Sequence, residues 1–203
     1  MVSVLVALEH LPEGRERDEQ AIDLRFGLRN ALVPQLEHGR VLTCLHEAEG
    51  LAKALGDQHR LGWVATYMTE CFGATGDTPR AVEVGQRALA LAGTLGDAAL
   101  QVVTRLFLGR IYFGLGDYPQ AIDLLRQNLV ALDGALRRER FGLSRLPSVT
   151  SRDILTRCCA EVGAFSEGLA HGEEGLRIAE AVDHPPQPDR SSLGHRPGPP
   201  PPG

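Results

Sequence analysis

The sequence predicts an all-α protein, an α-solenoid built from about four antiparallel helix pairs. Two forty-residue segments, 55–94 and 95–134, align without a gap and share the phrase Gly-Asp-x-Pro-x-Ala. Apolar residues in both segments recur at i, i+3, i+4 and i+7, the spacing of an amphipathic helix. Aromatic residues make up only 5% of the chain, which favours packed helices over sheet. A self-similar period of this size is typical of stacked repeats.

The shared phrase marks the corner between the two helices of a pair. Gly supplies the left-handed conformation that ends one helix, Asp caps the next, and Pro fits the first turn because its missing N–H is not needed there. The phrase "LGD" at 55–57 and 95–97 separates one pair from the next in the same way. The two segments therefore predict helices over Gln58–Thr75, Thr78–Leu95, Ala98–Leu115 and Tyr118–Leu132.

Weaker copies of the pattern flank these two pairs. Upstream we expect helices over Gln20–Leu32 and Gly39–Leu55, and downstream over Ser151–Val162 and Gly163–Glu180. The last copy is displaced by 47 residues instead of 40, so seven extra residues fall in the connection 136–149. We divide the chain into a remnant helix and linker (1–19), a helical repeat domain (20–182) and a Pro-rich disordered tail (183–203). That tail is either a flexible polyproline segment or an artefactual end.

Composition and charge exclude several functional classes. The net charge is −5, so no basic excess points to nucleic acid. No segment approaches the roughly 20 consecutive apolar residues of a membrane span, and the apolar run 2–8 lacks the basic flank and cleavage site of a signal peptide. The four cysteines form no C-x-x-C pair. We therefore expect a cytoplasmic protein with reduced thiols and no membrane or nucleic-acid partner.

The segment "LGRIYFGLGDYPQAIDLL" resembles the tetratricopeptide repeat. The family's helix–turn–helix positions are filled by Leu108, Gly109, Tyr112, Gly116, Asp117, Tyr118 and Ala121. The usual period is about 34 residues, so the forty-residue period is similar to the long-helix variety found in bacterial adenylate cyclase or kinase–ATPase signalling regulators. The resemblance implies a right-handed superhelix whose inner surface, formed by the first helix of each pair, binds a protein or peptide.

Carried over by register, nine positions would face that inner surface: Trp63, Thr66, Tyr67, Glu70, Leu106, Arg110, Phe113, Asp153 and Arg157. Trp, Tyr and Arg are residue types that anchor interfaces. Trp63 and Tyr67 have an equally good alternative, in which they pack against a neighbouring repeat. The family's clamp for C-terminal carboxylates does not carry over, because Thr66, Glu70, Val103 and Phe107 occupy its positions.

No motif predicts catalysis, a metal or a cofactor, so we expect a non-enzyme. The segment "CLHEAE" (44–49) contains a Cys, a His and two acids, but Gly50 stands where a zinc protease would need its second His. Two functions remain. The first is a scaffold for protein–protein contact that is a fragment of a bacterial signalling or regulatory protein. The second is a regulatory spacer within a larger adenylate cyclase or kinase–ATPase chain, which binds nothing by itself. In both cases uncapped repeat ends could lead to self-association.

Overall fold

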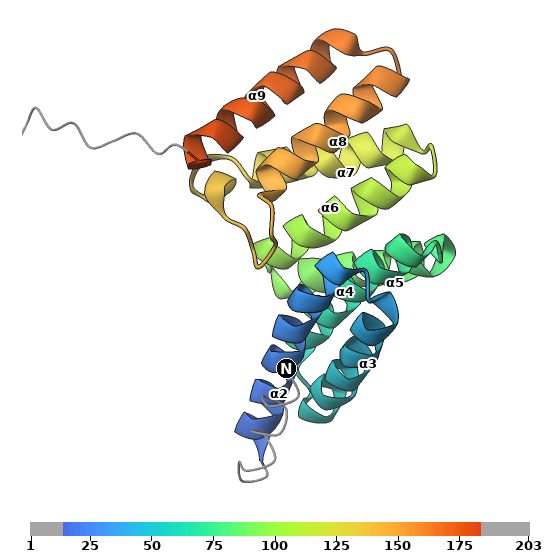
Figure 1. Ribbon diagram of the computed structural model, residues 1–203, viewed down its shortest axis with the longest axis vertical. Coiled ribbons are helices and arrows are strands. Elements are labelled where there is room, and N and C mark those ends of the chain that lie inside the picture. Colours follow the sequence, from blue (N-terminus) through green and yellow to red (C-terminus); the bar gives the residue numbers. More distant parts are fainter. Residues whose placement is uncertain (1–13, 184–203) are drawn as a thin grey trace, which may run out of the picture.

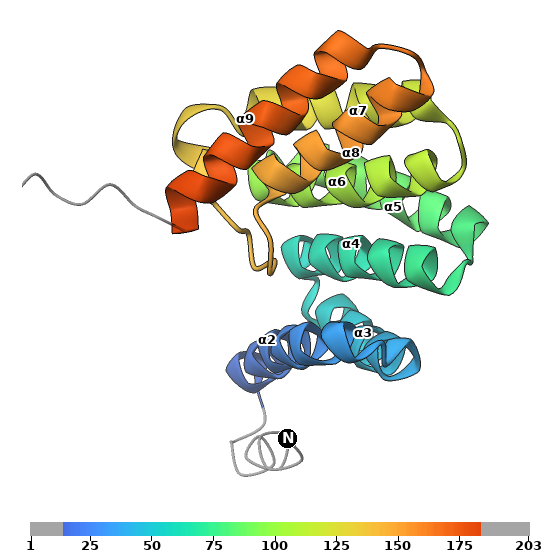
Figure 2. The same ribbon diagram turned by 45° about the horizontal axis from the view of Figure 1, so that its top comes forward.

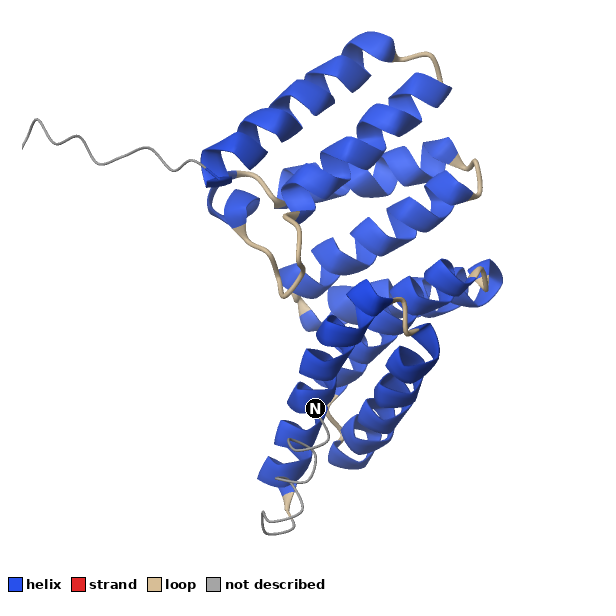
Figure 3. Cartoon of the chain, in the orientation of Figure 1, coloured by secondary structure: helices blue, strands red, loops and turns tan. Residues whose placement is uncertain are grey.

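The computed structural model describes residues 14–183, which form eight α-helices and no strand (Figures 1 and 3). The helices are α2 (Arg15–Leu32), α3 (His38–Leu55), α4 (Gln58–Thr75), α5 (Thr78–Leu95), α6 (Ala98–Gly114), α7 (Tyr118–Ala131), α8 (Pro147–Glu161) and α9 (Phe165–Asp183). Two short 3-10 helices, η1 (Val33–Gln35) and η2 (Gly134–Arg138), lie in the connections. The all-α prediction is confirmed.

The helices stack as antiparallel pairs in chain order, from α2–α3 at one end to α8–α9 at the other (Figures 1 and 2). Each helix packs on its neighbours in the chain, and α6 also packs on α4 and on α8. The first helices of successive pairs therefore lie side by side in one layer. The α2–α3 pair is turned relative to α8–α9, so the array twists along its length (Figure 1). This is the architecture of an α-solenoid.

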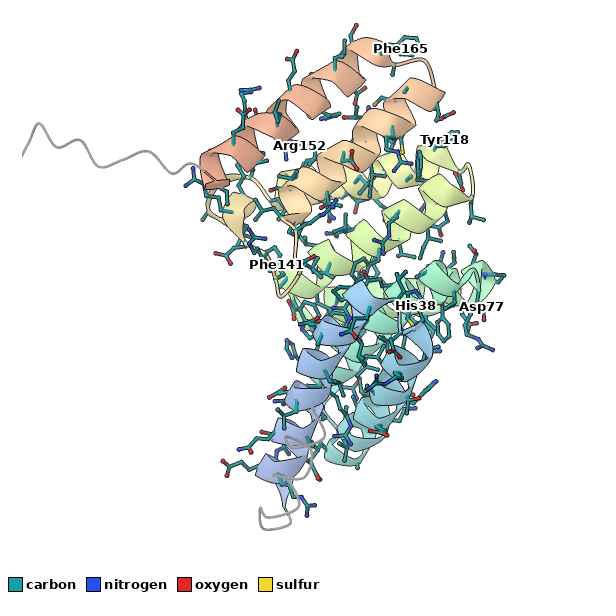
Figure 4. The ribbon with its side chains drawn as sticks, in the orientation of Figure 1. His38, Asp77, Tyr118, Phe141, Arg152 and Phe165 are labelled. Carbon is teal, nitrogen blue, oxygen red and sulfur yellow. The ribbon has the colours of Figure 1, made fainter. Side chains whose placement is uncertain are left out.

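Four of the corners, from the end of α3 to the start of α7, are built as the repeated Gly-Asp predicts. Gly56, Gly76, Gly96 and Gly116 all adopt a left-handed conformation, with φ between 65° and 83°. Asp57, Asp77, Asp97 and Asp117 follow them, and each side chain accepts a hydrogen bond from the backbone N–H three residues on. Figure 4 shows Asp77 at its corner. These contacts satisfy N–H groups that a helix start leaves without an intrahelical partner.

Small residues let the helices approach closely. The alanine of the repeated phrase, Ala81 or Ala121, is fully buried in both copies. At Gly85 in α5 a Cβ atom would lie 2.6 Å from Cδ2 of Leu108, and at Gly109 in α6 it would lie 2.8 Å from Cγ of Leu125. Both distances are shorter than carbon–carbon contact, so the two glycines fix how near α5 comes to α6, and α6 to α7.

Two helix boundaries differ from the prediction. The helix α2 starts at Arg15, not Gln20, and its first turn is polar and held by an Arg15–Glu19 ion pair of 2.8 Å, so apolar spacing does not reveal it. The helix α8 starts at Pro147, not Ser151, because proline suits a first helical turn. The remaining helices begin and end within three residues of their predicted bounds. The proposed tail, apart from Asp183, and residues 1–13 of the proposed remnant helix lie outside the described residues.

Candidate functional site

The nine predicted inner-surface residues differ widely in exposure. Thr66, Tyr67 and Leu106 are buried. Trp63, Glu70 and Phe113 are half-buried, and Arg110, Asp153 and Arg157 are exposed. Thr66 is 0% exposed and cannot meet a partner without movement of its neighbours. The other six lie on α4, α6 and α8, the helices that form the shared layer.

Tyr67 packs against the preceding repeat. Its ring stands edge-on to Phe26 of α2, with centroids 5.2 Å apart, and the guanidinium of Arg29 lies 4.1 Å above it. Trp63 lies beside the Tyr67 ring at 5.5 Å. Burial raises the pKa of the Tyr67 phenol. Of the two interpretations open for Tyr67, packing against a neighbouring repeat is the one that the structure shows.

Glu70 lies between two arginines from different repeats. One carboxylate oxygen accepts a hydrogen bond from Arg29 of α2, and the other lies 3.3 Å from Nη2 of Arg110 of α6. Arg29 is only 3% exposed, and its Nη1 donates to Oδ1 of Asn30 at 2.6 Å. Burial lowers the pKa of Arg29 and of Arg110, yet 49% of the Arg110 side chain reaches solvent. Arg110 therefore stands in a hollow, surrounded by protein but open to water.

Two cavities meet at this Arg29–Glu70–Arg110 cluster, and both are lined by Val33, Glu70 and Arg110. The first, of about 490 Å³, has apolar walls from Val41, Ile111 and the exposed Leu36 and Leu115, with His38 at its side. The second, of about 330 Å³, is lined further by Arg29, Leu106, Phe107, Thr150 and residues 142–145. Figure 4 shows Phe141 and His38 on opposite sides of the end of α2. We call the two cavities together the groove.

The connection between α7 and α8 forms one wall of the groove. It carries the seven residues by which this repeat exceeds the others. Phe141 and Gly142 turn the chain with φ of 48° and 76°, and Phe141 and Leu143 pack against the core. The hydroxyl of Ser148 donates to the carbonyl of Arg137 at 2.6 Å and ties the two ends of the connection together.

The structure gathers only some of the predicted residues into the groove. Tyr67, Glu70, Leu106 and Arg110 line it, whereas Trp63, Thr66, Phe113, Asp153 and Arg157 line neither cavity. Phe113 instead belongs to a separate, half-buried cluster, with Arg157 above its ring at 4.3 Å and the Tyr118 ring at 5.8 Å.

Sequence reasoning missed Arg29, Leu36 and Arg145. Arg29 had a signal: it precedes Glu70 by 41 residues, as Glu70 precedes Arg110 by 40, so the three occupy equivalent places in successive repeats. Leu36 and Arg145 lie in irregular connections, where register gives no guidance.

The candidate metal-binding and thiol side chains of residues 14–183 lie apart from one another or are buried. Residues 14–183 contain no group of three His, Cys, Asp or Glu side chains that could hold a metal. In the "CLHEAE" segment Cys44 is buried, while His46 is exposed and lies 3.8 Å from Glu49. All four cysteines are buried and unpaired. Burial, and then the neighbouring Cys159, raises the pKa of Cys158 to about 11. Among residues 14–183 no helix has the length and apolarity that a bilayer crossing requires.

Comparison with known proteins yields no family. No protein-family model matches the chain. No curated protein matches it either. Among solved structures, the crystal structure of BtubC (BKLC) from P. vanneervenii is similar over 89% of this chain and 97% of its own, at 13% identity and a TM-score of 0.37. A likeness at that level carries no argument about function.

Proposed function

We propose that this chain is a protein-interaction scaffold that binds a peptide segment of its partner in the groove. The observation that supports it is the meeting of the two cavities at Glu70 and Arg110. Ligand sites are concave, mostly apolar, and carry a few placed polar groups, and both volumes lie within or near the usual range of about 300–1,000 Å³. The tetratricopeptide resemblance points to the same kind of partner. The proposal assigns no catalytic step, metal or cofactor to the chain.

A display selection tests this function. A library of random 12-residue peptides is selected on the chain, and each enriched peptide is measured by fluorescence polarisation against the chain and against the Arg110→Glu variant. Arg110 is half exposed, so the substitution changes the groove without opening the core. We expect enriched peptides whose binding falls at least tenfold in Arg110→Glu. If every enriched peptide binds both proteins equally, the groove is not the binding site and the proposal fails.

A second function is favoured by a different observation, an apolar stripe on α9. Phe165, Leu169 and Leu176 are 65%, 67% and 61% exposed, and Figure 4 shows Phe165 at the end of that helix. Their equivalents 47 residues earlier, Tyr118, Ile122 and Leu129, pack against the core. The alternative proposal is therefore a non-binding spacer in a signalling chain, in which a further helix covers the stripe. Sedimentation of the chain against a Leu169→Glu, Leu176→Glu variant tests it. Self-association that the double variant abolishes supports a covered stripe, and identical monomers contradict it.

A further inference from the structure

The second cavity of the groove carries an excess of positive charge. Three guanidinium groups, those of Arg29, Arg110 and Arg145, line it against the single carboxylate of Glu70. The chain as a whole has the opposite sign, with a net charge of −5. Within residues 14–183 the exposed Arg145 takes part in no ion pair, so its charge is uncompensated by the part of the chain that the structure describes. A concave site with low-dielectric walls strengthens the field of such charges.

Glu70 cannot neutralise this cluster. Its two oxygens are each taken by one arginine, Arg29 and Arg110, so one carboxylate balances at most one of the two guanidinium charges. The Arg29 side chain is 96% buried, and its Nε has no hydrogen-bond partner within the described residues. A buried N–H of a charged group without a partner is unfavourable. The cluster therefore carries positive charge that residues 14–183 do not balance, and a partner can reach it at Arg110 and Arg145, since the Nε of Arg29 is itself buried.

The first cavity, on the other side of the shared residues, has different chemistry. Val33, Val41 and Ile111 form apolar walls, and Leu36 and Leu115 extend the apolar surface to the rim. These two leucines are 74% and 55% exposed. An apolar side chain placed there would remove both leucines from water. Because both cavities share Val33, Glu70 and Arg110, one peptide can reach both.

We propose that the groove selects a peptide segment that carries an Asp or Glu side chain close to a large aliphatic one. The carboxylate binds Arg110 and Arg145 in the second cavity, and the aliphatic side chain fills the first. This inference rests on the proposed scaffold function and specifies its partner. A side-chain amide cannot replace the carboxylate, because it brings no negative charge to the three arginines.

Three peptide pools test the inference. Each pool has a fluorescent label, 12 residues and a Leu flanked by random uncharged positions. The pools differ only in a second fixed residue, placed two to five positions from the Leu, which is Glu, Gln or Lys. Polarisation is measured with the wild-type chain and with Arg110→Gln, Arg145→Gln, Arg145→Glu and Leu36→Asn. The matched control is Arg177→Gln, an equal change of charge on exposed α9. Leu36 has φ 58°, a conformation that Asn tolerates well, so Leu36→Asn removes the apolar rim without backbone strain.

We expect the Glu pool to bind at least tenfold more tightly than the Gln pool, and less tightly as salt rises. A charge-assisted hydrogen bond contributes about 1.5–3 kcal/mol, so Arg110→Gln or Arg145→Gln should weaken the Glu pool about 10- to 100-fold. Arg145→Glu should shift the preference toward the Lys pool. Leu36→Asn should weaken the Glu and Gln pools alike, and Arg177→Gln should change nothing.

The outcomes separate the two levels of the proposal. Equal binding of the Glu and Gln pools, both lost in Leu36→Asn, would overturn the acidic specificity and leave the scaffold function standing. Binding that Arg177→Gln weakens as much as Arg145→Gln would overturn it too, because the effect would then be one of net charge. If no pool binds and the random library also yields no groove-dependent peptide, both proposals fall.

Discussion

Gly85 is a position where the repeat has almost no room for a side chain. A Cβ added there would lie 2.6 Å from Cδ2 and 2.9 Å from Cγ of Leu108, and 2.8 Å from Cγ2 of Thr69. Leu108 and Thr69 are both fully or nearly fully buried. Thr69 is also held by the hydrogen bond from its hydroxyl to the Ala65 carbonyl at 2.8 Å. Neither neighbour can move aside, so Gly85→Ala forces α5 and α6 apart.

The size of the effect follows from two opposed terms. Ala is favoured over Gly inside a helix by about 1 kcal/mol. Overpacking a close contact is unfavourable by about 1–3 kcal/mol. Gly93 lies in the same helix and has nothing within 4 Å of an added Cβ, so Gly93→Ala gains the first term without the second. We expect Gly85→Ala to be less stable than Gly93→Ala by about 1–3 kcal/mol, or about 4–8 °C in Tm at the middle of that range.

Urea denaturation followed by circular dichroism at 222 nm measures this difference. Both variants and the wild type are unfolded under identical conditions, and their midpoints are compared at a common slope. The expected order of stability is Gly93→Ala, wild type, Gly85→Ala. If Gly85→Ala matched Gly93→Ala, the approach of α5 to α6 would be wider than described, and the account of why this repeat has a glycine there would be refuted.

Three further predictions concern buried polar groups and thiols. The Thr104 hydroxyl donates its hydrogen to the Leu100 carbonyl, so in the Thr66–Thr104 hydrogen bond of 2.7 Å the donor is Thr66. Thr104→Val leaves the Thr66 hydroxyl without an acceptor and should lower the free energy of unfolding by about 1–3 kcal/mol. Adding Thr66→Val should restore part of that loss in the same urea assay. Burial raises the pKa of Asp57, but hydrogen bonds from Arg60 outweigh it and leave the pKa below its ordinary value. The ionised Asp57 therefore stabilises the fold above its unfolded-state pKa of about 3.9, and this stabilisation is lost as the pH falls through the lower pKa of the folded state. Asp57→Asn should accordingly flatten the dependence of Tm on pH below about pH 4. At pH 8 a thiol-reactive disulfide reagent should leave Cys158 unmodified in the folded chain and label it within minutes in urea; rapid labelling of the folded chain would contradict its burial.

Much of the fold can be predicted from the sequence because the turns between helices need residue types that few others can replace. Only glycine accepts a φ of 83° as readily as Gly76 does, and an Asp after it caps the next helix. Such positions locate helix ends to within a residue or two. The start of α2 was predicted five residues late because helical turns made of charged residues carry no apolar period. The sequence pattern places Pro147 in a connection, whereas the structure starts α8 there, because a proline marks a helix start as well as a loop.

The candidate site was predictable only where it follows the repeat. Glu70 and Arg110 were found by register, and Arg29 shares that register. The sequence allows two interpretations of Tyr67, an exposed residue that anchors a partner or a ring that packs against a neighbouring repeat. It cannot decide between them, because the packing depends on Phe26 of the preceding helix pair. Arg145 and Leu36 belong to segments without regular structure, whose path is set by contacts between distant parts of the chain.

The longer connection between α7 and α8 differs from the other connections because it departs from the forty-residue spacing of the repeat. The helices and their corners are bound to a strict spacing, since each must match the helix before it and the helix after it. The segment 139–146 need not match a neighbouring helix, although Phe141 and Leu143 within it pack against the core, and it supplies Arg145 to the groove. Under the proposed function, exchanging the exposed residues of this segment would change what the groove binds while the helices keep their sequence. For an engineer, the exposed positions of that segment are the place to randomise, with Phe141 and Leu143 kept and the hydrogen bond between Ser148 and Arg137 as the boundary of the insert.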